Sequence, residues 1–470
     1  MITILIGIVL LLCWLLFSKV LEKFRFVLVF GFLGLLVLSG GLFKITGFSG
    51  DLVPIVEYRW KQKAARTAST SGVPYTNSLT HTPFPQFGGP SRNGTVNSPS
   101  ISTNWSVAPP KLLWRIPMGE AWSGFAVVEG LAITQEQQEQ QEWVSAYKLE
   151  TGELVWKHMD DARYFTPLGG VGPRATPTIS SNRVYAFGAT GILNCLDLMS
   201  GRLLWSTNLS GGSVPEWGFS GSPLLHENRV IVAAGGAGRN LVALDALRGS
   251  SIWAAGNDQV GYSSPVLFNL SGQPQLVLFN WNGVDAFHPQ NGTALWHHPW
   301  PATHPHVAVP VQVSTNELLV SSGYGYGSER LRVTRREDQF QVEQIWKLNS
   351  LKSKFAMILQ HENHIYGLDD GIFVCIDPVT GERKWKDGRY GHGQMLLVGN
   401  LILLSSEKGE LVLIEPDPSE LREIVKLPVF NDKTWNPPAL AYPYLIMRNH
   451  KEAVCFLLPS STPPSVAFVN

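Results

Sequence analysis

The stretch GILNCLDLMSGRLLW, residues 191–205, decides the fold. It reads as a short apolar strand, an aspartate, a glycine-bearing turn and a second strand that ends in tryptophan. The same pattern recurs as WVSAYKLETGELVW (143–156), LVALDALRGSSIW (241–253), VDAFHPQNGTALW (284–296) and IFVCIDPVTGERKW (372–385). Each copy predicts a pair of antiparallel strands joined by a tight turn, so the chain is expected to be an all-β repeat protein.

The tryptophans that end these strands define the period of the repeat, because they follow one another at intervals of 39 to 50 residues. We interpret them as structural anchors between neighbouring repeats: Trp114, Trp156, Trp205, Trp253, Trp296, Trp346 and Trp385. The copy at 331–346 is degenerate but keeps its tryptophan. A further copy, ELVLIEPDPSELREIV (410–425), places Ile424 or Val425 where tryptophan is expected.

The two ends of the repeat region are half-repeats that complete each other. Trp114 ends a strand that has no partner strand before it, and EAVCFLL (452–458) is a partner strand with no final strand after it. Pairing residues 111–116 with 452–458 completes an eighth unit and leaves no unit with an open apolar face. The sequence therefore predicts an eight-bladed β-propeller closed by its N- and C-terminal strands.

This repeat resembles the tryptophan-docking motif of the PQQ-like (quinoprotein alcohol dehydrogenase-like) propeller family over roughly residues 85 to 458. FPQFGGPSRNG (84–94) is similar to the segment that precedes blade one in many bacterial members. The family includes quinoprotein alcohol dehydrogenases, which bind pyrroloquinoline quinone (PQQ), and the propeller lipoprotein of the outer-membrane assembly machinery. The resemblance implies the fold and leaves the activity open, because the motif is architectural.

Composition agrees with an all-β protein and gives no sign of a nucleic-acid partner. The chain has 37 basic and 37 acidic residues, only 16% charged residues, and 45 glycines and 31 prolines among its 470 residues. Zero net charge provides no general attraction to nucleic acid. Cys195, Cys375 and Cys455 recur at one phase of the repeat, which predicts buried strand residues and no disulfide framework.

The N-terminus predicts a membrane anchor, with two uncharged apolar runs at residues 2–17 and 26–43. Each run is about long enough to cross a bilayer as a helix. A transmembrane hairpin over residues 1–45 is favoured, and a cleaved leader followed by one anchor is the alternative. Residues 46–84 are expected to form a flexible linker, and residues 85–470 the propeller.

The membrane orientation rests on basic residues that favour opposite answers. Lys19, Lys23 and Arg25 against Glu22 favour a cytoplasmic connector and hence an extracytoplasmic propeller, which the resemblance also implies. The basic residues of 44–66 favour the reverse. We expect the propeller on the periplasmic or extracytoplasmic side of the cell membrane.

Candidate binding residues lie in the eight segments that join each blade's last strand to the next blade's first strand. Radial symmetry is expected to gather these segments on one face, with a local surplus of about three positive charges that favours a planar anionic ligand. Arg174 and Arg389 are expected to supply paired bonds to a carboxylate or phosphate. The full candidate set is Trp122, Arg174, Trp217, Ser220, Tyr262, Ser263, His306, Lys354, Arg389, His392, Trp435 and Asn436. A solvated rim or a protein-docking surface is the alternative interpretation.

Two function classes follow from these observations. The preferred one is a membrane-anchored binding or scaffold protein for a protein, glycan or small anionic ligand. The alternative is a PQQ-dependent dehydrogenase with Ca²⁺, but the chain lacks the vicinal cysteine pair of well-studied members, an Asx-rich calcium set and a CxxCH haem motif. No catalytic residue is assigned. His304 and His306 are expected to be hydrogen-bonding residues, and no metal site is predicted.

Overall fold

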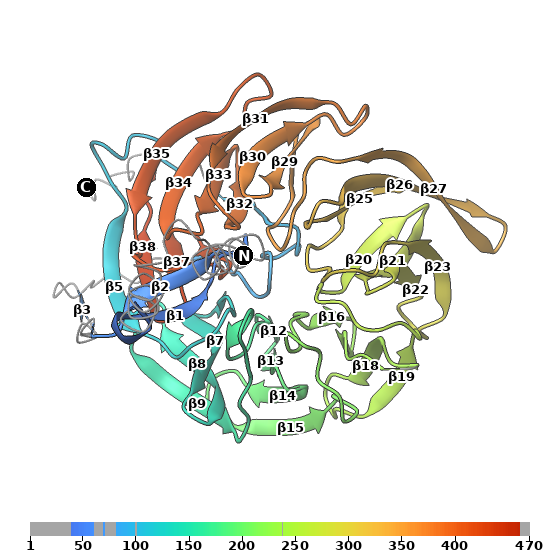
Figure 1. Ribbon diagram of the computed structural model, residues 1–470. Coiled ribbons are helices and arrows are strands. Elements are labelled where there is room, and N and C mark those ends of the chain that lie inside the picture. Colours follow the sequence, from blue (N-terminus) through green and yellow to red (C-terminus); the bar gives the residue numbers. More distant parts are fainter. Residues whose placement is uncertain (1–38, 61–68, 71–80, 99–100, 237, 461–470) are drawn as a thin grey trace, which may run out of the picture. The chain divides into compact units, whose positions relative to one another are not determined.

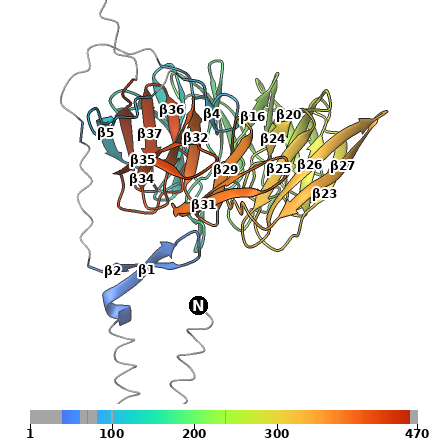
Figure 2. The same cartoon turned by 90° about the horizontal axis from the view of Figure 1, so that it is seen from above.

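The computed structural model describes residues 39–60, 69–70, 81–98, 101–236 and 238–460, and it divides into two compact units, Met1–Ala65 and Arg66–Asn470. The larger unit is a closed ring of eight antiparallel sheets, which Figure 1 shows along its axis and Figure 2 shows edge on. The prediction of an all-β, eight-bladed propeller is therefore confirmed.

Each of the first seven blades has four antiparallel strands in sequence order, the first nearest the axis. Blade one consists of β6 (Ala126–Val128), β7 (Leu131–Gln138), β8 (Gln141–Lys148) and β9 (Leu154–Asp160). Blade two consists of β12 (Thr178–Ser180), β13 (Arg183–Phe187), β14 (Ile192–Asp197) and β15 (Leu203–Asn208). Blade three consists of β16 (Leu224–His226), β17 (Arg229–Val232), β18 (Leu241–Asp245) and β19 (Ser251–Ala255). Blade four consists of β20 (Val266–Leu270), β21 (Gln273–Phe279), β22 (Gly283–Phe287) and β23 (Ala294–Pro299).

The second half of the ring continues the pattern. Blade five consists of β24 (Val311–Ser314), β25 (Glu317–Ser322), β26 (Gly327–Arg336) and β27 (Gln339–Leu348). Blade six consists of β28 (Leu359–His361), β29 (His364–Asp369), β30 (Ile372–Ile376) and β31 (Arg383–Arg389). Blade seven is β32 (Gln394–Val398), β33 (Leu401–Ser405), β34 (Glu410–Glu415) and β35 (Arg422–Pro428). Short strands β10 (Phe165–Thr166) and β11 (Gly170–Val171) form a hairpin between blades one and two.

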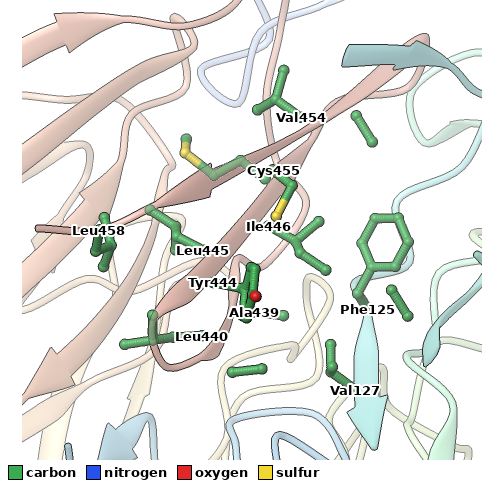
Figure 3. Packing of buried hydrophobic residues seen from close by; sticks show 14 of the residues in the cluster. Phe125, Val127, Ala439, Leu440, Tyr444, Leu445, Ile446, Val454, Cys455 and Leu458 are labelled. Carbon is green, nitrogen blue, oxygen red and sulfur yellow. The ribbon is translucent and has the colours of Figure 1, made fainter. Parts of the chain in front are cut away.

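Blade eight is built from both ends of the repeat region. Its inner strands are β36 (Ala439–Ala441), β37 (Tyr444–Arg448) and β38 (Glu452–Leu457), and its outer strand is β5 (Lys111–Pro117), with β3 (Ser69–Thr70) added beyond it. β38 pairs antiparallel with β5, from Glu452 opposite Pro117 to Leu457 opposite Lys111. The predicted closure by the terminal strands is thus confirmed, and the apolar cluster of Figure 3 packs blade eight against Phe125 and Val127 of blade one.

The repeat tryptophans link each blade to the next. The indole Nε1 of Trp114 donates to the Leu149 carbonyl of blade one at 2.8 Å, and that of Trp156 donates to the Leu198 carbonyl of blade two at 2.9 Å. Trp205, Trp346 and Trp385 make the equivalent bond. Trp296 bonds Gln275 of its own blade, and Trp253 has a buried Nε1 without a partner.

The tryptophan position carries the same backbone feature in all eight blades. The third-strand residue that pairs with it is followed directly by a β-bulge, as at Cys195 opposite Trp205 and Cys455 opposite Trp114. In blade seven, Val425 takes the tryptophan place opposite Leu413. Three buried free cysteines, Cys195, Cys375 and Cys455, lie on these third strands as predicted.

An arm formed by residues 81–98 lies along the first strands of several blades. Phe84 bridges to Val127 of blade one, and β4 (Thr95–Val96) adds in parallel to β32 of blade seven. Between them, buried Arg92 donates to the carbonyls of Ser222, Pro223 and Pro265 at 2.8–3.1 Å. The arm therefore links opposite sides of the propeller at its axis.

The smaller unit is described from residue 39 onward. Residues 39–42 are helical, and β1 (Phe43–Phe48) pairs with β2 (Pro54–Tyr58) in an antiparallel hairpin. This hairpin begins in the last residues of the predicted anchor, 1–45, and extends into the predicted linker, 46–84. Apart from residues 39–43, the two predicted spans lie outside the described residues, and no helix among the described residues is long and apolar enough to cross a membrane.

Candidate functional site

Two sets of connections meet on one face of the propeller, because strands alternate in direction within each blade. The segments that lead from one blade's last strand to the next blade's first strand form one set. The turns between second and third strands form the other, as when Lys352 before blade six pairs with Asp369 at 2.7 Å. We call this face the ring face. The candidate residues predicted from the sequence all belong to the first set.

A continuous circuit of aromatic, imidazole and cationic side chains surrounds the axis on the ring face. We call it the side-chain ring. Its members are Trp122, Tyr164, Arg174, Trp217, Tyr262, His304, His306, Tyr324, Lys354, Phe355, His392, Lys433, Trp435 and His450. All eight blade-to-blade segments contribute to it.

One side of the ring alternates aromatic rings with cations. Lys433 Nζ lies 3.7 Å from the ring centroid of Trp435 and 4.8 Å from that of Trp122, and the two indole centroids are 4.9 Å apart. Trp435 also contacts Phe355, at 5.2 Å between centroids. Cations are attracted to aromatic faces at such distances, so Lys433 stabilises the arrangement of both indoles.

The circuit continues through blades five to seven. Phe355 contacts His392, whose Nε2 lies 3.2 Å from Lys354 Nζ. Lys354 in turn lies over Tyr324 at 5.1 Å, and Tyr324 contacts His304 at 5.0 Å. Lys354 and His392 are both buried. The ammonium group of Lys354 therefore lies among the aromatic and imidazole rings of the circuit.

The remaining side runs from His304 back to Trp122. The His304 and His306 rings are 5.4 Å apart, and the Tyr262 backbone N–H donates to the His306 carbonyl. Tyr262 packs on Trp217 at 5.4 Å between centroids. Tyr164 bonds the carbonyls just before Trp217 and lies under the Arg174 guanidinium, and both Arg174 and Trp122 donate to the Gly169 carbonyl.

The structure separates the two arginines that the sequence placed together. Arg174 is directed into its own loop, where it donates to the carbonyls of Gly169, Gly170 and Gly172. Arg389 is the last residue of the outer strand β31, and its side chain is exposed. No contact joins them among the described residues. The structure therefore does not bring Arg174 and Arg389 together as a pair.

Three other candidate residues hold blades together. Ser220 donates to the Tyr262 carbonyl at 2.8 Å, and buried Ser263 donates to the Ala308 carbonyl. Buried Asn436 donates to the carbonyls of Ala121 and Ser123, which links blade eight to the segment before blade one. The other candidates, Trp122, Arg174, Trp217, Tyr262, His306, Lys354, His392 and Trp435, are members of the side-chain ring.

Glu407 is a functional candidate that sequence analysis missed. It lies in the turn between β33 and β34, and its carboxylate accepts from Trp435 Nε1 at 2.9 Å and from the His392 backbone N–H at 3.1 Å. It therefore fixes two ring members from different blades. Tyr324 and His450 come from the same kind of turn, and strand polarity is the signal that would have identified all three.

Burial sets the charge of the ring at neutral pH. It lowers the pKa of His304 to about 4 and also lowers that of His306, so both imidazoles are neutral. It raises the pKa of Tyr262 and Tyr324 to about 12. Burial also lowers the pKa of Lys433 to about 8, although Glu407 and Asp432 favour its charged form.

We expect an anionic ligand of the ring to bind more weakly as pH rises through about 8, because Lys433 then loses its proton. Titrating binding from pH 7 to pH 9 measures this loss. Lys433→Arg is the matched control, since a guanidinium keeps its charge and the profile should flatten. An unchanged profile in both proteins would mean that Lys433 does not contact the ligand.

The ring does not fit a calcium-bound quinone. Such a site needs oxygen ligands from carboxylates and amides around the metal. The ring carries cations and imidazoles, and Glu407 is already bonded to Trp435 and His392. Among the described residues, no group of three or more His, Cys, Asp or Glu side chains is placed to hold a metal ion. We therefore derive no redox step here.

Comparisons with known proteins place the chain among bacterial propellers. A family model described as outer membrane protein assembly factor BamB matches residues 140–387, more than half of the chain. Curated proteins of that name from Kangiella koreensis and Moranella endobia are 32% identical over 116 residues and 30% identical over 112 residues. Each alignment covers 23% of this chain and 26% of the relative, about a quarter of the relative's length.

Solved structures agree on the fold. BamB from Moraxella catarrhalis is similar with a TM-score of 0.54 and 15% identity, covering 74% of this chain and 99% of that chain. Quinohemoprotein alcohol dehydrogenase from Comamonas testosteroni is similar with a TM-score of 0.61 and 12% identity, covering 83% of this chain and 82% of that chain. At these identities the likeness shows the fold alone.

Proposed function

Because the chain belongs to the PQQ-like propeller family whose model is described as outer membrane protein assembly factor BamB, we propose that it is a binding and scaffold protein without catalytic activity. Its ring face holds an anionic ligand with aromatic or planar groups, and a segment of a partner protein is the occupant that its curated relatives favour. The predicted N-terminal helices anchor it in the membrane, with the propeller on the extracytoplasmic side.

The side-chain ring is the observation that carries this proposal. Tryptophan, tyrosine and arginine side chains dominate the energetics of protein interfaces, because they combine apolar area with polar groups. Here they form one circuit in which Trp122, Trp217 and Phe355 are only partly buried, and their remaining surface faces solvent. Contacts within the circuit fix these side chains, so a ligand meets a preorganised surface.

Site-specific photo-crosslinking in intact cells tests the proposal. A photoreactive phenylalanine analogue at Trp217 is expected to capture a defined partner, and the same analogue at exposed Leu203 on the outer strand β15 is the control. Capture should be lost when Trp122 and Trp435 are replaced by alanine. Equal capture from both positions would contradict a role for the ring face.

The enzymatic alternative is tested on the same purified protein. PQQ with Ca²⁺ is added, and binding and dye-linked alcohol oxidation are measured. Tight PQQ binding with turnover would overturn the proposal. Capture of a glycan in place of a protein would keep the ring face as the binding site and change its ligand class.

A further inference from the structure

The β1–β2 hairpin has two chemically different faces. Cross-strand partners share a face in an antiparallel pair, so Phe43 lies beside Tyr58 and Ile45 lies beside Val56 on one side. Trp60 joins them through its contact with Tyr58, at 5.4 Å between ring centroids. The opposite side carries the Lys44–Glu57 pair and half-buried Ile55, which lies opposite Gly47. The hairpin is therefore amphipathic.

The apolar side of the hairpin is exposed within the described residues. The side chains there are 44–64% exposed: Phe43, Ile45, Val56, Tyr58 and Trp60. The turn adds Leu52 at 51% and Val53 at 59%. An isolated two-stranded hairpin is marginally stable in water, so this surface needs a partner that covers it.

The hairpin is tied to the helical residues that precede it. The Arg59 backbone N–H donates to the Leu42 carbonyl at 2.8 Å, and its Nε donates to the Gly40 carbonyl at 2.9 Å. A guanidinium at this position caps the carbonyls at the end of the helix. These bonds therefore hold the end of β2 against the helical residues that precede β1, so the hairpin and those residues share one location.

That location is the end of the predicted membrane span. The uncharged run 26–43 finishes on the first residue of β1, which places the hairpin within a few residues of the bilayer surface. Trp60 and Tyr58 are the residue types that gather at membrane–water interfaces. Lys44 and Arg59 supply positive charge for anionic headgroups.

We infer that the β1–β2 hairpin is an interfacial membrane anchor that lays its apolar side in the headgroup region of the bilayer. The occupant is a lipid surface containing anionic headgroups. The hairpin thereby fixes the start of the linker against the membrane and sets where the tether to the propeller begins. This inference is independent of the ligand of the ring face.

Depth measurements on the full-length protein in phosphatidylethanolamine–phosphatidylglycerol vesicles test it. The experiment uses a Cys13→Ser background. The three other cysteines, which the structure describes, are buried, so labelling reports on the introduced cysteine. Val56→Cys and Ile45→Cys report on the apolar side, and Glu57→Cys on the opposite side is the matched control. Each is labelled with an environment-sensitive fluorophore.

We expect blue-shifted emission at positions 45 and 56, with most of it quenched by lipids that carry a nitroxide near the headgroup. Position 57 should show aqueous emission. Aqueous emission at all three positions would overturn the inference. Blue-shifted emission that no lipid nitroxide quenches would also overturn it, because the hairpin would then be covered by the propeller or by a second copy of the chain.

Discussion

Replacing Trp114 by alanine is expected to lower the free energy of unfolding by about 3–5 kcal/mol. Trp114 is fully buried in blade eight, the only blade among the described residues whose core strands come from both ends of the repeat region. Alanine removes the indole, its 2.8 Å hydrogen bond to Leu149 and its packing against Gly152 of blade one. One substitution thus weakens the closure of the ring.

Chemical denaturation of the detergent-solubilised full-length protein measures the loss. Leu112→Ala on the same strand is the control, because Leu112 is exposed and should change stability by no more than about 0.5 kcal/mol. Gly152→Ala tests the contact from the other side, since its Cβ would lie 2.8 Å from the indole. Gly130→Ala has a similar positive φ and no atom within 4 Å, so it isolates the backbone cost. A small loss for Trp114→Ala would contradict the anchoring role.

The closure was predictable because it follows from counting strands. A final strand at Trp114 without a partner and a partner strand at 452–458 without a final strand leave one solution that buries both. Blade seven has no tryptophan at this position, so it shows which features of the anchor depend on that residue type. Val425 keeps the register and the bulge opposite Leu413, so backbone geometry defines the position and tryptophan fills it.

The membership of the ring was only partly predictable, because spacing identifies segments and not side-chain directions. Trp217 and Tyr262 were found since they lie in blade-to-blade segments. Tyr324 was overlooked because it lies in the turn between β25 and β26 and not in a blade-to-blade segment. Arg174 was assigned to a ligand, but glycine carbonyls in its own loop accept its hydrogen bonds.

The β1–β2 hairpin was missed for a different reason. Its strands are short, and a bulge between Ile45 and Gly47 interrupts the alternation that sequence reading relies on. The charge of Lys44 and Arg59 was used only for membrane orientation. Their structural roles, at a strand pair and at the end of a helix, depend on contacts that spacing does not show.

Replacing either Trp122 or Trp435 by alanine is expected to weaken ligand binding at the ring face by about 30-fold or more, and the double variant should lose at least as much as the larger single loss. Central tryptophans of binding surfaces contribute 2 kcal/mol or more when they are truncated, and about 1.4 kcal/mol corresponds to a factor of ten. The two indole centroids lie 4.9 Å apart, and Lys433 Nζ lies over both rings. Their effects will not be additive, because the pair shares one cation.

Titration calorimetry with the partner segment captured by crosslinking measures the change, and Leu203→Ala on the outer strand is the control. The melting temperature distinguishes a loss of ligand affinity from a loss of folded protein. Both indoles are only partly buried, so the double variant should unfold close to the parent, in contrast to Trp114→Ala. Unchanged affinity with an unchanged melting temperature would exclude this side of the ring. The binding energy would then come from Trp217, Tyr262 and His304 across the axis. Binding should depend little on pH above about 6, because burial lowers the pKa of His304 to about 4 and keeps its imidazole neutral there.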